Sequence, residues 1–311
     1  MNQMQEIMQF CGDYPLMVRQ QQPLVHLLTN YVTVTDCVNA LLAVGARAIC
    51  SHAPEEAAQV TAGADALVCN LGGTEYYDAM ELSFRAALKT GIPVVIDPVG
   101  CGASSHRRRM CLRLMEKYAR MDLSCAGSAP DGGNAVGTNI ESGQSTVCAA
   151  DGPNALPSRS VLAVRGNYAE IQALISGHSD SPGLDDVQQV TVQEEMSLEE
   201  QMMAFSRRTG AMLIASGEVD LCTDGRNLKE VRRGTPALRR ITGAGCLSSA
   251  VLAAFLAAEP TLDSAASAVR LVGLAGEAAL AAVRETGTGA GHFHMYFLDA
   301  LSAGDEIWAE D

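Results

Sequence analysis

The stretch Gly91-Ile92-Pro93-Val94-Val95-Ile96-Asp97-Pro98-Val99-Gly100 contains the pattern that decides the fold. A glycine ends the helical pattern before it, and Pro93 then opens a short run of β-branched residues. Pro98 stops that run and leaves the Asp97 carboxylate at its carboxyl end. A new amphipathic segment begins at Ser105, so the stretch predicts a buried strand between two helices.

The same alternation of short strands and longer helices continues along the chain. Apolar runs predict strands at Ala48–Ser51, Ala66–Asn70, Pro93–Asp97, Val161–Arg165, Met212–Ser216 and Val219–Thr223. Amphipathic or Ala-rich segments predict helices at Thr35–Val44, Pro54–Ala62, Glu75–Thr90, Ser105–Tyr118, Ala169–Ile175, Leu198–Thr209, Leu247–Ala258, Leu262–Arg284 and Phe293–Ala303. This order predicts an α/β fold with a mainly parallel central sheet and helices on both faces.

Two polar stretches interrupt the alternation. Residues Met121–Pro157 are rich in Gly, Ser, Ala, Asn and Asp, and a structureless loop longer than about 15 residues is uncommon in a compact domain. We interpret this stretch as a disordered surface insertion in a single domain that spans residues 1–311. The second stretch, Gly177–Glu195, is predicted to be another exposed loop.

The composition indicates a soluble protein of a reducing compartment. The net charge of −14 argues against nucleic acids and anionic membranes as partners, because both need basic patches. The ten cysteines include no Cys-x-x-Cys pair, and several lie inside apolar runs, so no disulfide framework is predicted. The longest strongly apolar stretch, Leu247–Ala258, is shorter than the roughly 20 residues that span a bilayer, and no signal pattern is present. We therefore expect a cytoplasmic protein.

A glycine-rich turn, Thr242-Gly243-Ala244-Gly245-Cys246, directly precedes an apolar helix. Ligands of parallel α/β sheets bind beyond the carboxyl ends of the strands. Glycines let the backbone approach a ligand, and free N–H groups at a helix start bind anions. We expect the N–H groups of Gly243, Ala244, Gly245 and Cys246 to hold a phosphate in transfer, although a plain glycine-rich helix entry explains the turn alone equally well.

Cys246 is the candidate catalytic residue of this turn. It lies in the first turn of the helix, where the helix dipole lowers the pKa of a thiol, so thiolate character is expected. A thiolate can take a proton from a substrate hydroxyl as a general base. A thiol is a poorer base than a carboxylate, because it normally keeps its proton near neutral pH, and an inert buried cysteine is the alternative.

Charged residues at two other strand ends suggest a metal and phosphate site. Asn167 and Glu170 lie three residues apart across a helix start, and Asp97 ends another strand. Carboxylates such as Glu170 and Asp97 suit Mg²⁺, and Arg165 suits a polyphosphate. An Asn cap followed by a Glu that the helix dipole favours explains the first pair equally well.

Other nucleotide and metal motifs are absent from the sequence. Gly100-x-Gly102 follows a strand, but Ser105 stands where a dinucleotide fingerprint needs its third glycine, so a dinucleotide-dependent oxidoreductase is disfavoured. There is no Gly-Lys pair for a Walker A loop, no His-Glu-x-x-His and no Gly-x-Ser-x-Gly.

Six motifs in order carry a resemblance to a known family. They are Pro23-Leu24-Val25-His26 with Thr29-Asn30, Asn39-x-Leu41-Leu42-Ala43-x-Gly45-Ala46, Asp97-Pro98-Val99-Gly100-x-Gly102-Ala103, Arg165-Gly166-Asn167-x-Ala169-Glu170-Ile171, Gly217-Glu218-Val219-Asp220 and Thr242-Gly243-Ala244-Gly245-Cys246. With these motifs the chain strongly resembles the hydroxyethylthiazole kinases of thiamine salvage, which have the ribokinase-like fold. The resemblance runs from about Pro23 to Ala303, apart from the insertion.

The resemblance implies ATP-dependent phosphorylation of the hydroxyl of 4-methyl-5-(2-hydroxyethyl)thiazole with Mg²⁺, by a homotrimer with active sites at its subunit interfaces. It implies that ATP is contacted by Arg165 and Ser216, and the thiazole by Cys50 and Gly243. At the strand ends beside them, Asn167 is predicted to bind ATP and Asn30 to bind the substrate. Mg²⁺ is assigned to Glu170 and Asp97, and Cys246 takes the position where most ribokinase-like kinases have an Asp base. The chain departs from the family at Cys50, where Met is common, and at Ser216, where Thr is usual.

Two alternatives to a thiazole kinase remain open at this point. One is a related kinase that acts on another small alcohol, such as hydroxymethylpyrimidine or pyridoxal. The other is a nucleotide-binding protein without turnover, in which the insertion docks a partner.

Overall fold

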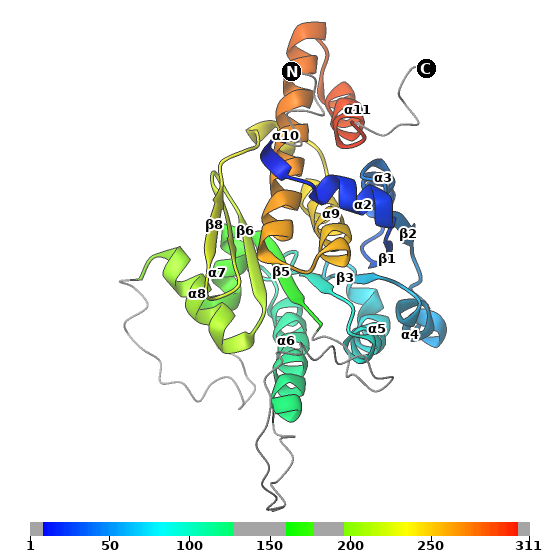
Figure 1. The fold of residues 1–311 in the computed structure, drawn as a ribbon, viewed down its shortest axis with the longest axis vertical. Helices are drawn as coiled ribbons and strands as arrows, with labels where there is room; N and C mark the ends of the chain where they lie inside the picture. Colours follow the sequence, from blue (N-terminus) through cyan, green and yellow to red (C-terminus); the bar gives the residue numbers. More distant parts are fainter. Residues whose placement is uncertain (1–8, 127–159, 177–195, 304–311) are drawn as a thin grey trace, which may run out of the picture.

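The computed structural model describes residues 9–126, 160–176 and 196–303. One eight-stranded sheet crosses the molecule in the order β2-β1-β3-β4-β5-β6-β7-β8 (Figure 1). The strands are β1 (Leu24–Leu28), β2 (Arg47–Ile49), β3 (Ala66–Asn70), β4 (Val94–Asp97), β5 (Leu162–Asn167), β6 (Met212–Ser216), β7 (Asp220–Thr223) and β8 (Leu228–Val231). The strands from β2 to β6 pair in parallel and the last two pair antiparallel, which confirms the mainly parallel sheet.

The side chains of the central strands alternate between two separate apolar cores. In β4, Val95 points into one core, whereas Val94 and Ile96 point into the other. In β5, Ala163 and Leu162 divide in the same way. Because successive strand residues face opposite sides of a sheet, an uninterrupted apolar run is what a strand covered on both faces requires.

Helices cover both faces, as predicted (Figure 1). The first core is closed by α2 (Tyr14–Gln21), α3 (Val34–Ala43), α9 (Ala244–Ala258), α10 (Leu262–Thr286) and α11 (Ala290–Leu301). The second core is closed by α4 (Pro54–Ala62), α5 (Tyr77–Thr90), α6 (Ser105–Ala126), α7 (Tyr168–Ser176) and α8 (Leu198–Thr209). Two short 3₁₀ helices, η1 (Thr74–Tyr76) and η2 (Pro236–Arg240), complete the described elements.

Local signals in the sequence explain where several helices begin and end. Pro54 occupies the first position of α4, where its missing N–H costs nothing. Ser197 and Glu200 form a reciprocal capping box at the start of α8. Gly91 ends α5 with a φ of 77°, a left-handed conformation that glycine adopts without steric cost. These positions fix the bounds that the sequence predicted.

The structure corrects the sequence-based elements in a few places. Strands β1 and β8 were absent from the predicted set. In β1 the polar residue His26 interrupts the apolar run, and β8, Leu-Lys-Glu-Val, carries charged residues on an edge strand. Helix α6 continues to Ala126, so the first residues of the predicted insertion extend a helix instead. The rest of Met121–Pro157, like Gly177–Glu195, lies outside the described residues.

Helix α10 corrects the prediction about apolar segments. By length and composition α10 is long and apolar enough to cross a bilayer. The longest strongly apolar segment among the described residues is therefore α10 and not Leu247–Ala258. Of its most apolar window, 61% is buried inside the fold, as expected for a core helix of this length.

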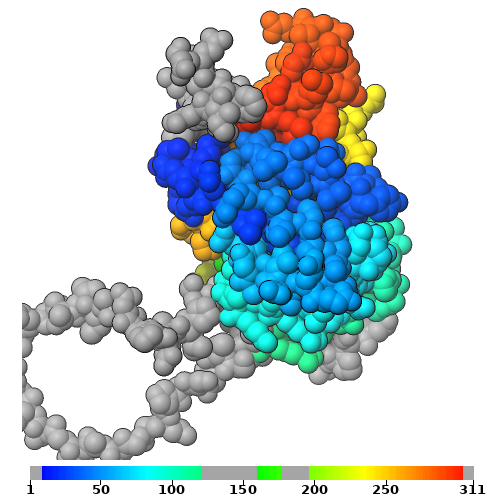
Figure 2. Space-filling model, turned by 90° about the vertical axis from the view of Figure 1, so that its right-hand side faces the viewer, coloured from blue at the N-terminus to red at the C-terminus, as the bar shows by residue number. Residues whose placement is uncertain are grey.

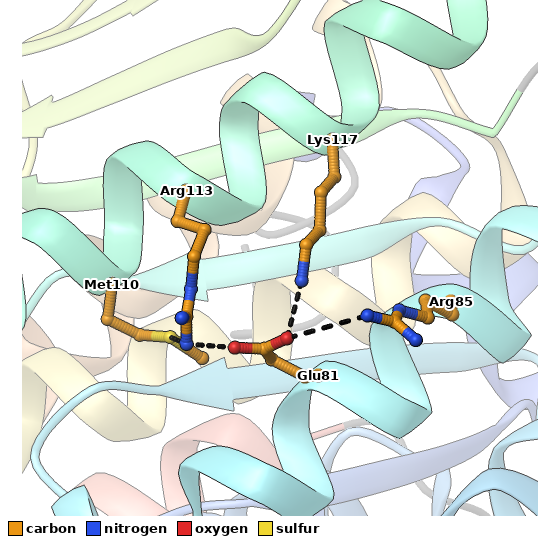
Figure 3. A network of polar contacts seen from close by, with 5 residues as sticks. All are labelled: Glu81, Arg85, Met110, Arg113 and Lys117. Atoms are coloured by element: carbon orange, nitrogen blue, oxygen red, sulfur yellow. Dashed lines mark hydrogen bonds and ion pairs between the residues drawn. The ribbon is translucent and has the colours of Figure 1, made fainter. Parts of the chain in front are cut away.

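An ion-pair network joins α5 to α6 on the second face (Figure 3). The Glu81 carboxylate of α5 contacts Arg113 and Lys117, both from α6, and Arg85 one turn further along its own helix. The Glu81 side chain is only 19% exposed, so this carboxylate is screened less than one in water. Three cations therefore depend on a single half-buried anion.

Glu81→Gln is expected to lower the free energy of unfolding by about 1–2 kcal/mol, because the three cations lose their shared counter-charge. The loss should shrink in high salt, which screens the remaining repulsion. Urea unfolding at low and high salt measures both effects. Glu230→Gln is the matched control: Glu230 pairs with Arg232 in the open, so its change should be near zero. Equal losses in the two variants would contradict the network.

Candidate functional site

The candidate residues follow one another along the carboxyl edge of the parallel strands. Across the sheet they occur in the order Cys50 after β2, Asn30 after β1, Asp97 at the end of β4, Asn167 at the end of β5 and Ser216 at the end of β6. Strands that run in parallel bring their carboxyl ends to the same edge, where α/β proteins bind ligands. The fold therefore gathers positions that lie up to 186 residues apart in the sequence.

The turn before α9 meets the middle of this edge. Gly243 is the N-cap of α9 and adopts a left-handed φ of 78°. A side chain there would collide with Thr33, because a Cβ built on Gly243 lies 2.5 Å from the Thr33 Cγ2 atom. The first intrahelical hydrogen bond runs from Leu247 N–H to Gly243 O, so the N–H groups of residues 244–246 have no acceptor within the helix. These N–H groups are therefore free of intrahelical partners at the start of α9.

A buried hydrogen-bond network links the turn to three strand ends. The Asp97 carboxylate, 2% exposed, accepts from Asn70 Nδ2 at 2.9 Å and from Ser249 Oγ at 3.0 Å, both at Oδ2. Asn70 Nδ2 also donates to Cys246 Sγ at 3.1 Å, and Asn30 Nδ2 lies 3.8 Å from the same sulfur. Burial raises the pKa of Asp97 to about 6, against the opposing effect of Arg165.

The structure corrects the expected thiolate character of Cys246. Burial raises the pKa of its thiol to about 12, and the neighbouring Asp97 carboxylate adds to the increase. These effects outweigh the helix dipole and the hydrogen bond from Asn70, because desolvation disfavours the charged form more strongly. Cys246 therefore keeps its proton at neutral pH.

Glu170 and Asn167 form a helix cap, which is the alternative that the sequence offered to a metal site. Asn167 N–H donates to Glu170 Oε2, and Glu170 N–H donates back to Asn167 Oδ1, each at 2.9 Å, which makes a capping box at the start of α7. Gly100 N–H donates to Glu170 Oε1 at 3.0 Å. Each carboxylate oxygen thus uses one lone pair on the backbone and keeps the other for a ligand or a water.

Arg165 reaches from β5 to the turn before α9. One guanidinium nitrogen donates to Gly245 O at 2.9 Å, and the close approach needs a glycine, because a Cβ on Gly245 would lie 3.0 Å from that nitrogen. The buried Arg165 Nε atom has no hydrogen-bond partner among the described residues. An unpaired buried donor beside free backbone N–H groups suits an anionic oxygen.

The outer residues of the site lie at its two ends. Ser216 is paired with Asn167 in the β5–β6 ladder, and Ser216 Oγ donates to Gly166 O at 3.3 Å. Cys50 is exposed beyond the edge strand β2, and none of the described hydrogen bonds joins it to the central network. The structure thus brings Asn167 and Ser216 together at neighbouring strand ends and leaves Cys50 apart from them, beyond the edge strand β2.

Two central residues of the network were not among the sequence-predicted site residues. Asn70 is the last residue of the predicted strand Ala66–Asn70, and Ser249 lies one turn into the apolar helix α9. The position of Asn70 at the end of a predicted strand was a signal that could have identified it. Ser249 has no such local signal, because only the packing of α9 on β4 brings its hydroxyl to Asp97.

The chain is similar to known proteins along almost its whole length. The family model for the hydroxyethylthiazole kinase family matches residues 16–127 and 148–306. The chain is 35% identical to a hydroxyethylthiazole kinase of Nitratidesulfovibrio vulgaris (strain DP4), over 94% of this chain and 92% of that protein. It is 30% identical to that of Ruminiclostridium cellulolyticum, over 93% and 90%. The structure of the hydroxyethylthiazole kinase protein from Pyrococcus horikoshii OT3 superposes with a TM-score of 0.70 at 28% identity, covering 95% of this chain and 93% of that one.

The ordered motifs and the similarity along almost the whole chain agree with one another. The resemblance read from the six motifs is thereby confirmed, together with the α/β fold that it implied. The chain belongs to the hydroxyethylthiazole kinase family.

Proposed function

We propose that this protein transfers the γ-phosphoryl group of ATP to the hydroxyl of 4-methyl-5-(2-hydroxyethyl)thiazole, giving the thiazole phosphate used in thiamine salvage. The observation that carries the proposal is the meeting of the Asp97 carboxylate with the first turn of α9 at the carboxyl edge of the sheet. A kinase needs a charged, pre-organised cradle at the point where the phosphoryl group passes, because positioning and charge neutralisation supply most of the catalysis.

The acceptor alcohol is assigned to the β1 and β2 side of the edge. Asn30 lies there with its amide directed toward Asn70 and the Cys246 sulfur, and Cys50 lies exposed beyond it. The Gly243 backbone lies so close to the Thr33 side chain that position 243 has no room for a side chain of its own. This side offers the polarizable Cys50 side chain and the Asn30 amide, which suit a neutral heterocycle with a hydroxyl.

ATP is assigned to the β5 and β6 side. Arg165 offers its unpaired Nε atom, and Ser216 and Asn167 lie beside each other at the strand ends. The γ-phosphate would then lie against the N–H groups of residues 244–246, between Arg165 and the acceptor hydroxyl. These groups would bind and orient the phosphates.

The residues present fit a Mg²⁺ ion held mostly by phosphates and water. Asp97 and Glu170 would contribute oxygen ligands, and both Glu170 oxygens retain a lone pair. Within the described ranges no group of three or more His, Cys, Asp or Glu side chains forms a closed metal cluster. Mg²⁺ commonly binds through one or two carboxylates plus substrate phosphates, and it would supply charge neutralisation there.

The role of Cys246 is tested by substitution. Cys246→Ser is expected to keep substantial activity, within about tenfold of the unmodified chain, because the protonated thiol contributes little as a base. Cys246→Asp should be tolerated or improved, since Asn70 Nδ2 can donate to a carboxylate at this position. Steady-state kinetics with saturating ATP measures both variants. Complete loss of turnover in Cys246→Ser with intact substrate binding would make the thiol essential.

We also propose that the protein acts as a homotrimer with interface active sites. Large apolar side chains are exposed on elements that follow β1 or pack beside them, at Tyr31 (78%), Val32 (56%), Leu42 (54%) and Met295 (60%). Their elements, the loop after β1 with α3 and α11, contribute to the face in Figure 2, where α11 packs on α3. Sedimentation equilibrium at micromolar concentration should give a trimer, and a monomer there would count against this part of the proposal.

The compartment is proposed to be the cytoplasm. The eight cysteines whose side chains the structure describes are free, which suits a reducing environment.

The experiment that tests the proposed reaction is an ADP-release assay. Hydroxyethylthiazole with Mg²⁺ and ATP should give turnover well above that with hydroxymethylpyrimidine or pyridoxal. A preference for either of those alcohols would assign the site to a different small-alcohol kinase. ATP binding without ADP release for any alcohol would identify a nucleotide-binding protein without turnover.

A further inference from the structure

Asn70, the last residue of β3, holds the centre of the buried network. It is 1% exposed, and its carboxamide takes part in four hydrogen bonds. The amide nitrogen donates to Asp97 Oδ2 at 2.9 Å and to Cys246 Sγ at 3.1 Å. The oxygen accepts from Asn30 Nδ2 at 3.1 Å and from the Gly72 N–H at 3.0 Å. Both hydrogens and both lone pairs of the amide are therefore used.

The chemistry of its neighbours fixes which way this amide faces. The backbone N–H of Gly72 can only donate, so it must meet the oxygen of Asn70. The NH₂ group must then face the carboxylate of Asp97, which can only accept when ionised. A 180° flip would turn the Asn70 NH₂ group toward two donors, Gly72 N–H and Asn30 Nδ2, and would turn its oxygen toward the Asp97 carboxylate. Each hydrogen bond left unmade in this buried site costs about 1–3 kcal/mol.

This single orientation couples two parts of the site. The donor to Asp97 comes from the neighbouring strand, at the position paired with Asp97 in the β3–β4 ladder. The second donor comes from Ser249 on α9, and both address Oδ2, so the carboxylate plane is fixed from two sides. The same Asn70 nitrogen holds the sulfur in the first turn of α9. Asn70 thus sets the position of the Asp97 carboxylate relative to the helix start that cradles the phosphate.

We infer that Asn70 is a positioning residue for phosphoryl transfer, acting through Asp97 and Cys246 rather than by touching the nucleotide. The inference rests on the proposed function, and it deepens that function by naming the side chain that orients its centre. The inference requires a carboxylate at position 97 on β4 and an amide at position 70 on β3, and it predicts that the exchanged arrangement is inactive.

A swap of the two side chains tests the inference. Asn70→Asp keeps the shape and the two acceptor bonds but loses both donors and places two carboxylates in contact. We expect kcat to fall about 10²-fold, with the KM for ATP within about threefold, because the nucleotide side is untouched. The Tm should fall as well. The double variant Asn70→Asp/Asp97→Asn restores an amide–carboxylate hydrogen bond with the partners exchanged, so its Tm should recover while its activity stays lost.

Two further variants serve as controls. Asn227→Asp makes the same chemical change beside another carboxylate, because Asn227 Nδ2 donates to Asp224 Oδ2 at 3.2 Å on an exposed turn, and it should leave kcat unchanged. Ser249→Ala removes one donor from Asp97 and none from Cys246, so its loss in kcat should be smaller than that of Asn70→Asp.

Several results would overturn the inference. They are a kcat within threefold in Asn70→Asp, recovery of activity in the double variant, and failure of the double variant to recover its Tm. Absence of turnover by the unmodified chain with every alcohol would instead overturn the proposed reaction. In that case the Tm values of the swap would still decide whether the Asn70 amide and the Asp97 carboxylate are coupled.

Discussion

Asp97→Asn is expected to lower turnover on the order of 10³-fold and at the same time to stabilise the fold at neutral pH. The loss of turnover follows from removing the only carboxylate in the network around the α9 turn among the described residues. The fold should survive, because an amide oxygen at position 97 still accepts from Asn70 and Ser249. A variant that is more stable and yet inactive is unusual, since most core substitutions destabilise.

The sign of the stability change follows from the raised pKa of Asp97. A carboxyl group whose pKa rises on folding, here from 3.8 to about 6, binds its proton more tightly in the folded state. Its effect is absent below pH 3.8, and between pH 3.8 and about 6 it lowers the stability of the unmodified chain progressively. Above that range the full cost, about 3 kcal/mol as an upper limit, is present. Asp97→Asn should therefore exceed the unmodified chain in Tm at pH 8 and lose this advantage toward pH 4.

Asp224→Asn is the matched control for the pH series. Partial burial acts to raise the pKa of Asp224, but the backbone N–H groups of Asn227 and Arg226 outweigh it, and the pKa is lowered. Its ionised form therefore stabilises the fold, so Asp224→Asn should lower the Tm at pH 8 and leave ADP release unchanged. Thermal unfolding at several pH values and the ADP-release assay measure both variants. An unchanged or lower Tm for Asp97→Asn at pH 8 would contradict the buried-charge argument.

Gly243→Ala is expected to cost more than about 3 kcal/mol of folding free energy and to abolish activity in whatever folds. Two effects add at this position. A left-handed φ of 78° disfavours any L side chain, and the new methyl group would lie 2.5 Å from the Thr33 Cγ2 atom. Relief of the contact would move the start of α9, whose N–H groups form the proposed phosphate cradle.

Gly287→Ala separates the two effects. Gly287 ends α10 with a φ of 66°, but no atom lies within 4 Å of a Cβ built on it, so its substitution should cost only about 1–2 kcal/mol. Thr33→Ser removes the Cγ2 atom, so adding it to Gly243→Ala should recover part of the stability. Chemical denaturation gives the free energies of unfolding for all four chains. Equal losses at Gly243 and Gly287, or no recovery with Thr33→Ser, would contradict a steric cause.

The sequence was most informative where the structure depends on neighbours in the chain. The bounds of β3, β6, α4 and α8 agree with the prediction, because apolar runs, a proline at a helix start and a capping box act within a few residues. The placement of Asp97, Asn167 and Ser216 at one edge also followed, since parallel strands share their carboxyl ends. The family resemblance rests on the same strand-end motifs.

The sequence was less informative about what each site residue does. Glu170 was predicted from its residue type as a metal ligand, but spacing alone does not distinguish this role from the capping box that the structure contains. Ser249 was not found, because its partner Asp97 lies 152 residues away and only the packing of α9 on β4 brings them together. Contacts of this kind depend on the whole fold.

The sequence by itself therefore determined the parallel sheet, the gathering of polar residues at its carboxyl edge and the glycine turn before α9, because each depends on local residue patterns and on the common direction of the strands. Only the tertiary structure decided the protonation of Cys246 and Asp97 and the orientation of Asn70. Burial excludes the water that would favour the charged forms, and the Asp97 carboxylate opposes ionisation of the Cys246 thiol. Both effects arise from groups that meet only after the chain has folded, and no local pattern records them.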